Sequence, residues 1–124
     1  MFTSGFRYDR GMIISPQSCG ACKDGVHEPF PFSMAFQPIV DVDARRVFAY
    51  EALVRGPNNE PAASIFEQLT EENRYSFDQS CRVKAITLAH RLNLAETGAA
   101  LSINLIPGAV YSPVACIQLT LKTA

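Results

Sequence analysis

The stretch YEALVRG, residues 50–56, decides the fold of this chain of 124 residues. It continues an apolar run and is followed by the turn-forming residues Pro-Asn-Asn, which together indicate a β-strand that ends in a turn. Side chains two residues apart on a strand share a face, so Glu51, Leu53 and Arg55 point the same way. A carboxylate and a guanidinium on an apolar strand are costly to desolvate unless something pairs them. Either Glu51 and Arg55 pair with each other, or they line a site that binds a cation and an anion together.

The segments around this strand predict an alternation of strands and helices. Residues 34–42 read as another strand, and the short polar turn before the strand over 47–55 predicts an antiparallel hairpin. Downstream, the pattern predicts a short helix over 61–69, a longer helix over about 72–92 and a strand over 100–105.

The longer predicted helix carries an apolar stripe, whose residues recur at steps of three and four positions. The stripe consists of Phe77, Cys81, Ala85, Leu88 and Leu92. After the strand over 100–105, the pair Ser112-Pro113 gives a further helix-start signal. We therefore expect an α/β fold.

Three blocks of the sequence, taken together, resemble the EAL domain family. They are Gln-Pro-Ile-Val at 37–40, Glu-Ala-Leu-Val-Arg-Gly at 51–56 and Leu-Ser-Ile-Asn-Leu at 101–105. The resemblance covers roughly residues 32–124. The family comprises metal-dependent phosphodiesterases that hydrolyse cyclic di-GMP to the linear dinucleotide pGpG. The resemblance implies a (β/α)8 barrel of the TIM type in which the first two strands are antiparallel.

A complete (β/α)8 barrel takes about 250 residues. The chain is therefore expected to hold the N-terminal half of an EAL domain over 32–124, truncated after the third strand and the helix that follows it. Residues 1–31 hold four of the seven glycines and no sustained periodicity, and we expect them to form a loop-like leader that contains cysteines. An open half barrel exposes strand edges, which predicts either a homodimer or pairing with the missing C-terminal half.

The resemblance assigns roles to five residues. It implies that Glu51 and Asn104 are ligands of Mg²⁺ or Mn²⁺, and that Gln37, Leu53 and Arg55 contact the cyclic dinucleotide. Carboxylate and carboxamide oxygens suit such hard cations, and a guanidinium fork suits a phosphate. From the residues alone, Leu53 could equally belong to the barrel core, Asn104 could be a buried amide satisfied by the backbone, and Gln37 could be an ordinary polar residue near a strand end.

The leader carries a separate motif, Cys19-Gly-Ala-Cys22. A Cys-x-x-Cys pair can bind Zn²⁺ or cycle as a dithiol, and His27 could be a third zinc ligand. No fourth ligand is evident nearby, and a pair of free thiols is the ordinary alternative. Cys81 and Cys116 lie on apolar helix faces and are expected to be buried as small apolar side chains.

Composition limits the class of protein. The net charge is −1 at pH 7 and arginines are scattered, so we expect no DNA, RNA or membrane partner. No apolar run approaches the ~18 residues of a membrane span, and no secretory signal is evident, which predicts a cytoplasmic protein.

The predicted function is that of an EAL-type cyclic di-GMP phosphodiesterase domain, present as a fragment that is inactive alone. No Asp or Glu follows Asn104, so the acidic residues that the family carries on later strands are missing from this chain. The alternative is a degenerate EAL-like module that binds cyclic di-GMP or another protein in signalling.

Overall fold

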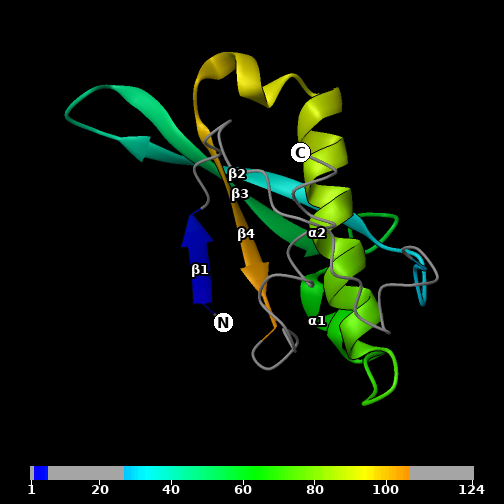
Figure 1. Cartoon of the computed structure of the whole chain (residues 1–124). Helices are drawn as coiled ribbons and strands as arrows, with labels where there is room; N and C mark the ends of the chain where they lie inside the picture. Colours follow the sequence, from blue (N-terminus) through cyan, green and yellow to red (C-terminus); the bar gives the residue numbers. More distant parts are fainter. Residues whose placement is uncertain (1, 6–26, 107–124) are drawn as a thin grey trace, which may run out of the picture.

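The computed structural model describes residues 2–5 and 27–106, which form a mixed β-sheet with helices packed beside it (Figure 1). Its strands are β1 (Phe2–Gly5), β2 (Ser33–Asp41), β3 (Arg46–Arg55) and β4 (Ala100–Leu105). They lie in the order β1-β4-β3-β2. β2 and β1 run antiparallel to their neighbours, whereas β3 and β4 are parallel. The predicted α/β fold and the antiparallel hairpin are confirmed.

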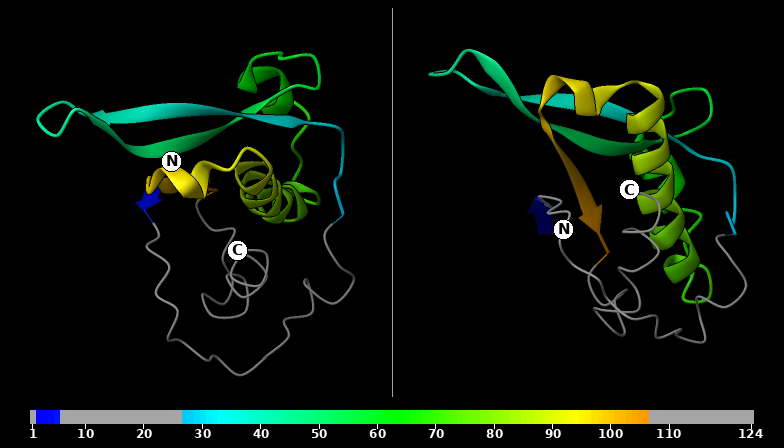
Figure 2. Two further views of the ribbon diagram at one scale, coloured as in Figure 1. Left: turned by 90° about the horizontal axis from the view of Figure 1, so that it is seen from above. Right: turned by 45° about the horizontal axis from the view of Figure 1, so that its top comes forward.

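The β2–β3 hairpin extends beyond the rest of the sheet (Figures 1 and 2). Its turn is closed by the Asp41 carboxylate, which accepts hydrogen bonds from the backbone N–H groups of Asp43 and Ala44 at 3.1 and 3.0 Å. Near the turn the register shifts, because Ile39 faces Ala49 while Val40 faces Val47. This leaves one extra residue on β3, which is a β-bulge. The projecting end exposes four apolar side chains: Ile39, Val40, Val42 and Phe48.

Two α-helices separate β3 from β4. The short helix α1 spans Ala62–Phe66 and the long helix α2 spans Arg74–Arg91, which confirms both predicted helices within a few residues. Ahead of α2, Thr70 and Asn73 exchange hydrogen bonds between side chain and backbone, which fixes the approach to the helix. The predicted exit loop after α2 contains one turn of 3-10 helix, η2 (Leu94–Thr97).

Aromatic rings form the centre of the core. The Phe77 side chain is 1% exposed, and its ring lies 5.3 Å from that of Phe30, 5.1 Å from that of Phe32 and 6.4 Å from that of Phe66. Cys81 is buried beside them as a free thiol, as predicted.

The apolar stripe of α2 is shorter than predicted. Phe77, Cys81 and Ala85 are buried, but Leu92 is 59% exposed. The helix ends at Arg91, and Asn93 then adopts a left-handed conformation with φ of 55°, so the chain turns away before Leu92 can reach the core.

The predicted loop-like leader contains a strand. β1 pairs with β4 from Phe2↔Leu105 to Gly5↔Ser102, so loop-like is the wrong description for these four residues. Backbone pairing to a strand edge requires no apolar pattern in the added strand, which explains why the sequence did not reveal it. Cys19, Cys22, Cys116 and the helix predicted at Ser112 lie outside the described residues. No helix in the described part of the chain is long and apolar enough to cross a membrane.

Replacement of Phe77 by alanine tests the assignment of the core. Because this ring fills the space between three other aromatic rings, we expect Phe77→Ala to lower the free energy of unfolding by about 3–5 kcal/mol. The measurement is urea unfolding followed by circular dichroism. Phe48→Ala removes an equally large ring that is 53% exposed, and this control should change stability by no more than about 0.5 kcal/mol. Equal losses in the two variants would contradict the assignment.

Candidate functional site

The parallel pairing of β3 and β4 determines which polar side chains meet. The register places Glu51 beside Ser102 and Ala52 beside Ile103. Paired residues on adjacent strands share a face of the sheet, and so do residues two apart on one strand. Glu51, Ser102 and Asn104 therefore lie on the same face of two neighbouring strands.

Glu51 and Asn104 are in direct contact. The Asn104 Nδ2 donates a hydrogen bond to Glu51 Oε1 at 3.1 Å, although the two residues are 53 positions apart in the chain. On the other side of β3, Gln37 of β2 pairs directly with Glu51 in the antiparallel ladder. The structure thus brings three of the five predicted site residues together across three strands.

Ser102 is a member of this group to which the sequence analysis gave no role. It is 4% exposed, and its Oγ lacks a hydrogen-bond partner within the described residues. A buried hydroxyl without a partner is uncommon, because its desolvation is not compensated. The signal was present in the sequence, since Ser102 is two residues from Asn104 on a predicted strand.

Leu53 and Arg55 continue the Glu51 face toward the end of β3, and both are half-buried. Arg55 donates from Nη1 to the Val54 carbonyl oxygen at 2.7 Å. Among the described residues, no ion pair joins Arg55 to Glu51, so the alternative of a purely structural pair between them is not what the structure contains.

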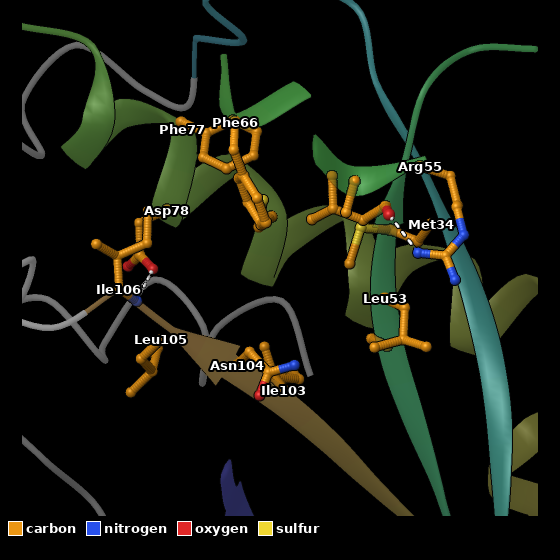
Figure 3. Close-up of a pocket in the computed structure, with 14 residues that line it drawn as sticks. Met34, Leu53, Arg55, Phe66, Phe77, Asp78, Ile103, Asn104, Leu105 and Ile106 are labelled. Atoms are coloured by element: carbon orange, nitrogen blue, oxygen red, sulfur yellow. Dashed lines mark hydrogen bonds between the residues drawn. The ribbon is translucent and has the colours of Figure 1, made fainter. Parts of the chain in front are cut away.

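A pocket connects part of this site to the core. It is lined by Leu53, Arg55 and Asn104 together with apolar side chains such as Met34 and Phe66 (Figure 3). Glu51 and Gln37 do not line this pocket. Gln37, Glu51, Ser102 and Asn104 therefore form a polar row across three strands. This row lies next to an apolar pocket and is not enclosed in one cavity with it.

The turn after Arg55 is fixed by a residue that the sequence analysis did not single out. The Glu60 carboxylate accepts a hydrogen bond from the Asn58 backbone N–H at 2.8 Å, and the Glu60 carbonyl accepts one from the Gly56 N–H at 2.9 Å. Hydrogen bonds from backbone N–H groups, its own and that of Asn58, hold the pKa of the Glu60 carboxyl below its ordinary value. A Cβ at Gly56 would overlap the Glu60 side chain, which explains the glycine at this position.

The donors fit part of the shell of a hard cation. Glu51 offers a carboxylate, Asn104 a carboxamide and Ser102 an unpartnered buried hydroxyl, and such oxygen donors suit Mg²⁺ or Mn²⁺. Across residues 2–5 and 27–106, no three His, Cys, Asp or Glu side chains are grouped to hold a metal ion. The zinc or redox role of Cys19, Cys22 and His27 stays a prediction, because only His27, which is exposed, lies within the described residues.

A buried carboxylate of α2, that of Asp78, links the helix to the carboxyl end of β4 and pairs with Arg82 of the same helix. Asp78 Oδ1 accepts a hydrogen bond from the Ile106 backbone N–H at 2.8 Å (Figure 3), and Asp78 Oδ2 lies 3.3 Å from Arg82 Nη1. Both side chains are at most 3% exposed. Neither residue was among the predicted site residues, because a charged pair four positions apart on a helix ordinarily indicates a solvated face.

The chain is similar to solved structures. The chain is similar to a standalone versatile EAL protein from Vibrio cholerae O395, solved in a form with c-di-GMP bound, with 53% identity and a TM-score of 0.73 over 79% of this chain and 40% of that one. It is also similar to Klebsiella pneumoniae BlrP1 in a complex with calcium and cyclic di-GMP, with 29% identity and a TM-score of 0.66 over 90% of this chain and 26% of that one.

One curated relative is the blue light- and temperature-regulated antirepressor BluF of Escherichia coli K12. It is 38% identical over 73 residues, which are 59% of this chain and 18% of BluF. No protein-family model matches the chain. The chain spans less than half the length of each of these proteins.

The pH dependence of stability tests the buried pair. Burial raises the pKa of the Asp78 carboxyl, and the Ile106 N–H and Arg82 only partly oppose this effect. The folded state then binds the proton more tightly than the unfolded state, so the stability from this group is complete below the unfolded pKa of about 3.9 and is lost as pH rises through the raised pKa. We expect the unfolding free energy of wild type minus that of Asp78→Asn to fall as pH rises through this window.

Urea unfolding at a series of pH values between 3.5 and 7 measures this difference. Ser80→Ala alters a buried, non-titrating side chain of the same helix and should differ from wild type by the same amount at every pH. A wild-type advantage that grows as pH rises would mean that the pKa of Asp78 is lowered in the folded state, and would contradict the expectation.

Proposed function

We propose that the chain is the N-terminal part of an EAL domain, that it belongs to the lineage of phosphodiesterases that hydrolyse cyclic di-GMP, and that its polar row binds this dinucleotide together with a divalent cation. The observation that carries the proposal is the 3.1 Å contact between Glu51 and Asn104, which places a carboxylate and a carboxamide from different strands at one point. The similar structures support it, because they are complexes with c-di-GMP, in part with calcium or manganese as well.

In this proposal Glu51 and Asn104 would hold Mg²⁺ or Mn²⁺, with the Ser102 hydroxyl beside them. When bound, the cation would supply positive charge that favours attack of water on a phosphodiester. Arg55, at the end of β3, would hold a phosphate oxygen with its guanidinium. Leu53 would present an apolar side chain to the ligand, and Gln37 would offer an amide from the opposite strand.

The chain of 124 residues is proposed to be catalytically inactive alone. The polar row contains a single carboxylate, that of Glu51, and Mg²⁺ gives up its hydration shell reluctantly. One carboxylate, one carboxamide and one hydroxyl compete weakly with water for Mg²⁺. The polar row also holds no second carboxylate that could act as a general base. Completion of the site would require residues from a C-terminal half or from a second copy of the chain. A cytoplasmic location, without a nucleic-acid or membrane partner, stays part of this proposal.

A second candidate function is a binding or protein-interaction module in signalling. The name of BluF, antirepressor, describes a role other than hydrolysis in a protein that is 38% identical over the matched segment. The exposed apolar end of the β2–β3 hairpin also offers a surface of the kind that marks contacts between proteins. In the first candidate, Glu51 and Asn104 bind a cation next to the dinucleotide. In the second, the chain binds another protein and these two residues need not bind a cation.

Binding of cyclic di-GMP distinguishes the two candidates. We expect isothermal titration calorimetry on the full chain to detect cyclic di-GMP binding with MnCl₂ present and to lose it when EDTA replaces the metal. Glu51→Gln removes the only carboxylate of the polar row and should abolish this metal-dependent heat. Glu67→Gln makes the same substitution at an exposed position on another segment and should bind as wild type does. No binding by wild type, together with a stable complex with another protein, would favour the interaction module.

Hydrolysis should be absent even where binding is found. We expect the purified chain to release no pGpG from cyclic di-GMP with Mg²⁺ or Mn²⁺, because one carboxylate and two neutral oxygen donors do not complete a site for in-line attack. Liquid chromatography of the nucleotides after prolonged incubation measures this, with a buffer-only sample as the reference. Turnover that Glu51→Gln eliminates would show that the chain alone is an enzyme.

A further inference from the structure

Asp78 of helix α2 has a buried carboxylate that lies at the end of β4, the strand that carries Asn104. The Asp78 side chain is 2% exposed and accepts the Ile106 N–H at 2.8 Å, and it lines the same pocket as Asn104 (Figure 3). Ile106 follows the last residue of β4 and is two positions beyond Asn104. The hydrogen bond thus joins the second turn of the helix to the backbone at the end of β4.

The carboxylate is held from two directions. One oxygen accepts the Ile106 N–H, and the other faces the Arg82 guanidinium at 3.3 Å, one helical turn away. The Ile106 side chain also packs against the aromatic core. The end of β4 is therefore fixed by a polar contact through its backbone and by an apolar contact through its side chain.

Stability alone does not account for this arrangement. A buried ion pair is often no more stabilising than apolar residues of similar volume, because both charges must be desolvated. Here the compensation is incomplete, since Asp78 Oδ2 and the Nε and Nη1 atoms of Arg82 have no hydrogen-bond partner within the described residues. The short hydrogen bond of Asp78 goes instead to a backbone group 28 positions away.

We propose that Asp78 is a positioning residue for the cation site, and that its hydrogen bond to Ile106 holds the end of β4 so that Asn104 stays beside Glu51. Arg82 keeps the carboxylate in the required orientation. This inference rests on the proposed function, because it assigns a position to a ligand of the proposed cation. Groups outside the first shell of a metal commonly contribute in this way by orienting the ligands.

Three variants separate positioning from folding. Asp78→Asn keeps an oxygen that can accept the Ile106 N–H but loses the charge. The double variant Asp78→Leu/Arg82→Leu removes the acceptor without leaving an unpaired buried charge, so it should fold. Ser80→Ala is the matched control, because the buried Ser80 hydroxyl donates to the carbonyl oxygens of Ser76 and His27, neither of which belongs to β4.

The experiment is a titration of each full-length chain, labelled with ¹⁵N, with MnCl₂, after circular dichroism has established which variants fold. Paramagnetic broadening of the Glu51 and Asn104 amide signals reports weak local binding of the cation. Hydrogen exchange of the Ile106 amide reports the hydrogen bond itself. We expect wild type, Asp78→Asn and Ser80→Ala to broaden at similar Mn²⁺ concentrations, and the double variant to require about 10- to 100-fold more. Ile106 exchange should be fast only in the double variant.

The outcomes are distinct. Localised broadening in wild type that is unchanged in the double variant would overturn the positioning role and leave the proposed function standing. An Ile106 amide that stays protected in the double variant would overturn it as well. Absence of localised broadening in wild type would refute the cation site, and the positioning role would fall with it. If Asp78→Asn does not fold, wild type, the double variant and Ser80→Ala still decide the question.

Discussion

The parallel register between β3 and β4 is the constraint on which the site depends. It pairs Glu51 with Ser102, and so brings the Asn104 carboxamide within 3.1 Å of the Glu51 carboxylate. A shift of one residue would turn every side chain of β4 to the opposite face, and Ile103 would replace the polar residues beside Glu51. The chemistry of the site is therefore a property of pairing between strands rather than of either strand alone.

Helix α2 packs against the sheet and contributes Phe77 and Cys81 to the core cluster. A parallel pair requires a crossover connection, and α1 and α2 provide it. The apolar face of α2 carries Phe77 and Cys81 into the core, while Asp78, adjacent in sequence, reaches the end of β4. One helix thus supplies both the apolar contacts that stabilise the fold and the polar contact that fixes a strand end.

Much of this fold could be predicted from local patterns. Two strand-like runs joined by a short polar turn predicted the hairpin, and the three- and four-residue spacing predicted α2, because both signals are contained in short stretches of chain. The meeting of Glu51 and Asn104 was predicted through a family resemblance, and the contact between them is present. Three features were not predicted, namely β1, the Asp78–Ile106 contact and the buried Ser102 hydroxyl. β1 and the Asp78–Ile106 contact depend on partners far away in the sequence, and neither has a local pattern that identifies it. Ser102 did have a local signal, because it lies two residues before Asn104 on a predicted strand, but its burial is a property of the folded sheet.

The position of β1 limits how the sheet can grow. A strand has two edges, and β4 already pairs with β3 along one and with β1 along the other. The next strand of a parallel barrel would need the edge that β1 occupies, so the two are competitors for one row of backbone donors and acceptors. Any strand that docked on this edge of β4 would therefore have to displace β1.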